Sequence, residues 1–136
     1  MSPVPKKKFK KQYASEILRI AKGDLESAEV LSKSKSGRKE NVVFLAQQAI
    51  EKALKSVLVH HQVAIPFVHD LGALVALLPD PVSPPGGFDL IQLNPYASIR
   101  RYEEGSSPLT EEEIQIVMDA AKSVIKWAVN LIGKEV

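Results

Sequence analysis

The sequence predicts an all-α fold, an up-and-down bundle of four to five helices, on three observations. Apolar residues recur at spacings of three and four along three long segments, which is the period of one buried helix face. No segment shows the apolar–polar alternation of a half-buried strand. The connections between the periodic segments are rich in glycine, proline and polar residues, which interrupt the helical pattern.

The first two helices are expected to form an antiparallel hairpin. The first carries its apolar stripe within ASEILRIAKGDLESAEVL, residues 14–31, and the polar stretch SKSKSGRKEN ends it. The second extends from about Val42 to His61. Its polar side should be a solvated face with an ion pair between Glu51 and Lys55, four residues apart; a ligand groove is the alternative. That side carries Gln47, Gln48, Glu51, Lys52 and Lys55.

A third, short helix is expected from about His69 to Leu78. The stretch PDPVSPPGG follows it and cannot continue a helix, because proline lacks the backbone N–H and clashes with the preceding turn. FDLIQL can add a further turn. Asn94 and Pro95 are typical of an N-cap and a first helical position, so a helix should restart through YASIRRY.

The last helix has the strongest local signals. Thr110 and Glu113 have the spacing of a capping box, and Leu109 before the cap can pack on Ile114 as a hydrophobic staple. Gly133 suits its end. These signals predict a helix that starts just after Thr110.

Composition indicates one soluble domain. The 136 residues fit a single domain, and no apolar run is long enough to cross a bilayer, so we expect no membrane contact. The chain has no cysteine, which is compatible with the cytoplasm, the compartment we expect. Residues 1–11 hold five lysines and are interpreted as a flexible basic tail, a solubilising arm rather than a nucleic-acid contact. Residues 12–133 form the expected domain.

A second apolar seam on two helices suggests a partner surface, because a bundle with one interior needs one apolar stripe per helix. The alternative is that a fifth helix or the proline-rich loop covers it. If the seam is an interface, a two-fold homodimer is the commonest outcome. The seam comprises Ile116, Ala120, Trp127 and Leu131 on the last helix, with Phe44 and Leu58 on the second.

The three histidines are interpreted as structural or surface residues, with a ligand-binding role for His69 and a metal or catalytic role as alternatives. His60 and His61 are adjacent on a helix, so their side chains diverge by about 100° and do not readily share one metal ion. His69 opens the next helix beside Asp70, whose carboxylate can accept from free N–H groups. We expect no metal and no cofactor.

Three stretches together resemble the HEPN (higher eukaryotes and prokaryotes nucleotide-binding) domains. They are AKGDLESAEVL, in which Asp24 and Ala28 match, FLAQQAIEKALKSVLVHHQVAIPFVHDL, and IRRYEEGSSPLTEEEIQIVMDAAKSVIKWAV. The resemblance covers residues 12–132. It implies a helical bundle that usually dimerises and often works beside a minimal nucleotidyltransferase. It also implies a relation to metal-independent ribonucleases of toxin–antitoxin and defence systems, whose active residues are an Arg followed four to six positions later by a His.

The chain departs from the ribonuclease pattern. No His follows Arg100 and Arg101, Glu103 stands where the family commonly has Pro, and Val68 stands where it usually has Thr. Without that His, the usual chemistry lacks its acid–base partner. These departures from the family pattern therefore favour a non-catalytic module.

Arg100, Arg101 and Tyr102 are the best candidates for ligand contact. Two guanidiniums beside an amphipathic ring can bind a phosphate and a base. The alternative is structural: Asp24 lies at the edge of an apolar stripe, and we hypothesise that one of the two arginines pairs with it. His69 and Lys52 complete the candidate ligand-binding set.

Three functions remain open at this point. The first is a non-catalytic binding module that dimerises, acts with a nucleotidyltransferase-like protein, or binds a nucleotide or RNA. The second is a ribonuclease that combines Arg100 or Arg101 with His69. The third is a purely structural partner.

Overall fold

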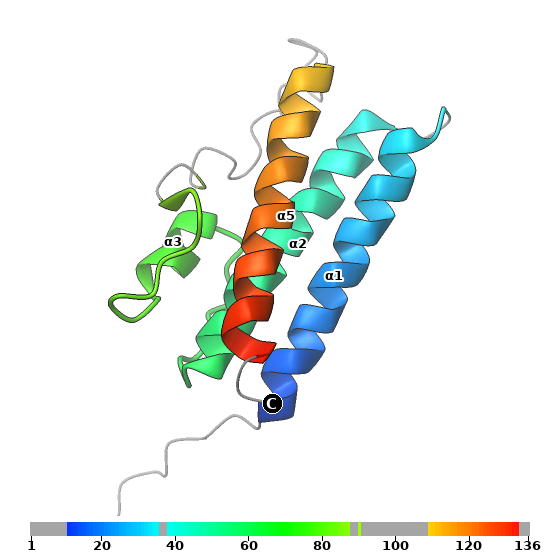
Figure 1. Ribbon diagram of the computed structural model, residues 1–136. Coiled ribbons are helices and arrows are strands. Elements are labelled where there is room, and N and C mark those ends of the chain that lie inside the picture. Colours follow the sequence, from blue (N-terminus) through cyan, green and yellow to red (C-terminus); the bar gives the residue numbers. More distant parts are fainter. Residues whose placement is uncertain (1–10, 36–37, 88–89, 91–108, 134–136) are drawn as a thin grey trace, which may run out of the picture.

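In the described part of the chain, three long helices form a bundle, with a fourth, short helix packed beside it (Figure 1). They are α1 (Lys11–Lys33), α2 (Lys39–His60) and α5 (Glu111–Gly133), and the short helix is α3 (Leu71–Ala76). The computed structural model describes residues 11–35, 38–87, 90 and 109–133. The described residues contain no strand. The predicted all-α bundle is confirmed.

Helix α2 is the central element of the bundle. It packs against α1, α3 and α5, and α5 starts at the same end of the bundle as α2 (Figure 1). Small residues such as Ala46, Ala49 and Ala53 are completely buried, so neighbouring helices can approach its backbone closely. No described helix is long and apolar enough to cross a membrane.

Leu58 corrects one expectation. The sequence pattern placed it on an outward seam, but its side chain is completely buried. The last turns of α2 are covered by α3 and by the segment before it, where Val63 and Ile65 pack against the core. This stretch of α2 therefore buries more than one stripe, since additional chain lies on its second side.

The helix starts follow their capping residues. The Thr110 hydroxyl accepts from the Glu113 backbone N–H at 3.1 Å, and the Thr110 backbone N–H donates to the Glu113 carboxylate at 3.3 Å, as a capping box requires. Helix α3 starts two residues later than expected, because the Asp70 carboxylate accepts from the backbone N–H groups of Gly72 and Ala73 and makes Asp70 the N-cap. The helix expected through YASIRRY and the basic tail up to residue 10 lie outside the described residues.

Candidate functional site

A salt bridge joins the middle of α1 to α2. The Lys52 Nζ donates to the Asp24 Oδ2 at 2.6 Å, and the two side chains are 29% and 21% exposed. Asp24 precedes Leu25 at the edge of the α1 apolar face, where an unpaired carboxylate would be costly. The salt bridge therefore compensates the charge of Asp24 where α1 packs against α2.

A second polar cluster surrounds Glu51, one residue before Lys52. The Glu51 carboxylate is 6% exposed and accepts from the Lys55 Nζ at 3.2 Å and from the His69 Nδ1 at 2.9 Å. The predicted Glu51–Lys55 ion pair is confirmed. The expectation that Glu51 lies on a solvated face is wrong, because the segment before α3 packs over this side of α2 and brings His69 to it.

Residues 51 and 52 serve different helix contacts because neighbouring positions on a helix point about 100° apart. Lys52 reaches α1, and Glu51 reaches the start of α3. The HEPN-like Glu-Lys pair is therefore a junction at which α2 is tied to two other parts of the chain.

His69 is hydrogen-bonded to Glu51 through one ring nitrogen, while most of its side chain is exposed to solvent. A carboxylate can only accept a hydrogen bond, so the Nδ1 of His69 donates to Glu51. The side chain is nevertheless 84% exposed. A neutral ring held in this way presents Nε2 as an acceptor, which is how carboxylates orient acid–base histidines.

His60 and His61 lie at the end of α2, where their rings meet edge to face with centroids 5.2 Å apart. Within the described residues, no three side chains of His, Cys, Asp or Glu come together in a way that could hold a metal ion. The two rings are therefore a local contact at a helix end.

The predicted arginine–tyrosine site falls outside the described residues, which contain neither Arg100, Arg101 nor Tyr102. Asp24 was expected to pair with one of these arginines, and the partner that the structure shows for it is Lys52. Among the candidate ligand residues, Asp24 and Lys52 are brought together and His69 joins Glu51. The contact between Glu51 and His69 was missed, because it depends on how an irregular segment returns along α2.

The candidate interface residues divide into two groups. Trp127 and Leu131 are partly buried and line a groove of about 690 Å³ with Pro84 and Pro85. The proline-rich segment thus borders this part of the seam. The other group is exposed on the surface and comprises Phe44, 50% exposed, and Ile116, 55% exposed.

Comparison with known proteins identifies the family. A family model described as the HEPN domain matches residues 14–132, which is most of the chain. No curated protein and no solved structure matches the chain. The match includes α2, α3, all but the first three residues of α1 and all but the last residue of α5. The chain therefore belongs to the HEPN domain family, whose general function relates to nucleotides and RNA.

Proposed function

We propose that this protein is a non-catalytic HEPN module that binds a nucleotide or RNA through Arg100, Arg101 and Tyr102. The observation that carries the proposal is the 2.6 Å salt bridge between Lys52 and Asp24. This carboxylate was the competing structural partner for the arginines. Because Lys52 already neutralises it, neither guanidinium is needed for that role.

The residue types suit a phosphate and a base. A guanidinium forms paired hydrogen bonds to phosphate oxygens, and two in succession can contact neighbouring phosphates. A tyrosine ring supplies a face on which a base can stack, and this contact is tolerant of sequence. The expected ligand is therefore single-stranded RNA or a nucleotide, bound without sequence readout.

Fluorescence anisotropy with labelled single-stranded RNA tests the proposal. The variant Arg100→Ala/Arg101→Ala should lose most of the binding while it melts at the wild-type temperature. Arg19→Ala is the matched control, since Arg19 is exposed and pairs with its neighbour Glu16. Equal affinity of wild type and the double variant would remove the proposed site.

A homodimer and a nucleotidyltransferase partner belong to the same proposal. Ile116 and Phe44 supply exposed apolar surface near one end of the bundle, and Trp127 and Leu131 supply the groove. Sedimentation of wild type should report a dimer that Ile116→Asp disrupts, whereas Val30→Asp, an exposed position on α1, should not. If the neighbouring reading frame encodes a small nucleotidyltransferase, co-expression of the two proteins should yield a complex.

The Glu51–His69 contact favours one alternative, a metal-independent ribonuclease of toxin or defence type. An exposed imidazole oriented by a buried carboxylate can exchange a proton with a ribose hydroxyl. RNA incubated with the purified protein discriminates between the two functions. Cleavage that is lost in both His69→Ala and Glu51→Gln would favour the ribonuclease, and intact RNA with retained binding would favour the module.

A further inference from the structure

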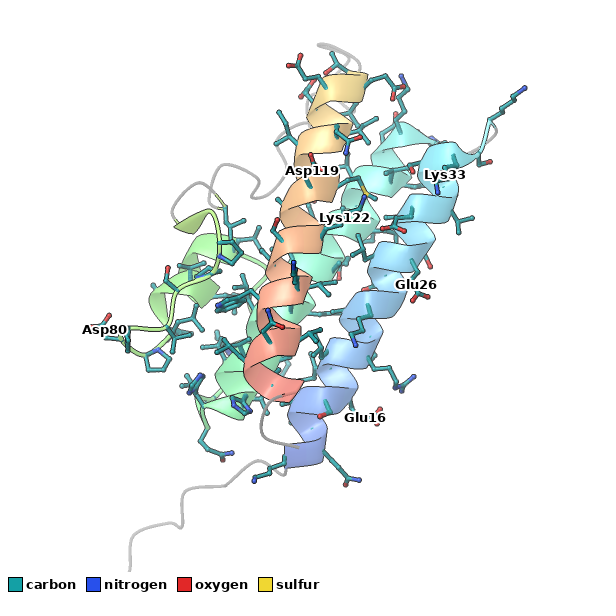
Figure 2. The ribbon with its side chains drawn as sticks, viewed as in Figure 1. Glu16, Glu26, Lys33, Asp80, Asp119 and Lys122 are labelled. Atoms are coloured by element: carbon teal, nitrogen blue, oxygen red, sulfur yellow. The ribbon has the colours of Figure 1, made fainter. Side chains whose placement is uncertain are left out.

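A cleft of about 460 Å³ lies where α1 ends and where α2 and α5 begin. Its volume falls within the range of small-ligand sites. Its lining includes three buried apolar residues, Val42 from α2 with Ile114 and Met118 from α5. Four lysines also line it: Lys33, Lys35, Lys39 and Lys122. We call this site the lysine cleft. Figure 2 shows Lys33 at the end of α1 and Lys122 on α5.

Two of these lysines have carboxylate partners within the cleft. The Lys39 Nζ lies 3.1 Å from the Glu111 carboxylate, and the Lys122 Nζ lies 3.9 Å from the Glu29 carboxylate. The side chains of both pairs, lysines and glutamates alike, are at least 40% exposed. Exposed ion pairs of this kind are weak, so an incoming anion can compete for both lysines.

The other two lysines, Lys33 and Lys35, have no ion-pair partner among the residues that the structure describes. They lie two residues apart at the end of α1 and in the segment after it. With four lysines against two glutamates, the lining of the cleft carries a net positive charge.

We propose that the lysine cleft binds a phosphate-bearing ligand, with the phosphate on Lys33 and Lys35 and the organic part on the apolar lining. Ammonium groups on flexible stems bind phosphate as point charges, and a polyphosphate offers several charges within a small volume. A free polyphosphate or nucleotide and the terminal phosphate of an RNA share this chemistry. The lining of the lysine cleft shares no residue with the proposed arginine–tyrosine site.

Calorimetric titration with sodium pyrophosphate tests whether the lysine cleft binds a phosphate anion. Wild type should bind it, and Lys33→Ala/Lys35→Ala should bind about tenfold more weakly, as expected for two lost surface charge contacts. Lys11→Ala/Lys22→Ala is the matched control, because it removes the same charge from exposed positions elsewhere on α1. Glu29→Gln/Glu111→Gln should bind more tightly than wild type. The proposal is overturned if wild type does not bind, or if both lysine double variants bind equally.

Two further titrations identify the source of the phosphate. A 5′-phosphorylated RNA oligonucleotide that binds more tightly than its 5′-hydroxyl form, with the difference lost in Lys33→Ala/Lys35→Ala, assigns the site to RNA ends. ATP that binds more tightly than pyrophosphate, with the same dependence on the lysines, assigns it to nucleotides. Arg100→Ala/Arg101→Ala should bind pyrophosphate as wild type does. Loss of binding in that variant alone would place the anion at the arginines and refute the cleft.

Discussion

Replacement of Glu51 by alanine removes the carboxylate through which α2 contacts His69, just before α3. The Glu51 side chain is 6% exposed and accepts from Lys55 at 3.2 Å and His69 at 2.9 Å. In Glu51→Ala, Lys55 keeps its charge with its side chain only 18% exposed, whereas His69, at 84% exposed, recovers its hydrogen bonds from water. The two lost contacts therefore differ in how much each lowers the free energy of unfolding.

The contact with Lys55 should dominate the change in the free energy of unfolding. A hydrogen bond to a charged, part-buried group contributes about 1.5–3 kcal/mol, and an exposed contact such as that with His69 contributes about 0.5 kcal/mol. We expect Glu51→Ala to be less stable by about 2–3.5 kcal/mol. For a domain of this size, that lowers the melting temperature by roughly 10 °C.

Urea denaturation followed by circular dichroism measures the loss. Glu16→Ala is the control, because Glu16 is exposed at the lower end of α1 (Figure 2) and its ion pair with Arg19 should contribute less than about 0.5 kcal/mol. A stability loss in Glu51→Ala no greater than in Glu16→Ala would show that the buried carboxylate does not hold this junction.

Three further changes test the packing and the polar contacts. A double-mutant cycle with Asp24→Ala and Lys52→Ala should give a coupling of about 1 kcal/mol in urea denaturation, whereas additive single effects would deny the salt bridge. Thr110→Ala should lower stability by about 1 kcal/mol because it removes the cap of α5, and unchanged stability would contradict the capping box. Leu58→Ala should cost about 2–5 kcal/mol and Phe44→Ala much less in the monomer, and similar losses would contradict their different burial.

The helices could be predicted from the sequence because their signals are local. Apolar spacing places the three long helices, and Thr110 with Glu113 sets the start of α5 within a few residues of chain. Asp70 offered the same kind of signal for α3. Its carboxylate was expected to accept from free backbone N–H groups, and it does, although the helix begins at Leu71 rather than at His69.

The contacts that build the candidate site are less predictable because they are long-range. Burial of Glu51 depends on a segment eighteen residues later in the chain. The sequence pattern showed only that Glu51 lies opposite the main apolar stripe. The pairing of Asp24 with Lys52 could have been predicted, since both residues lie near the middle of neighbouring antiparallel helices. The two adjacent arginines were instead expected to supply the partner. The family resemblance, carried by three stretches in combination, is confirmed over residues 14–132.

The most direct test of a binding module without cleavage measures RNA affinity and RNA integrity in the same samples. Labelled single-stranded RNA is titrated with wild type, Arg101→Glu and His69→Ala, and each sample is then separated by gel electrophoresis. The proposed function predicts that wild type and His69→Ala bind, that Arg101→Glu does not, and that the RNA stays intact in all three. Cleavage by wild type that disappears in His69→Ala would contradict it.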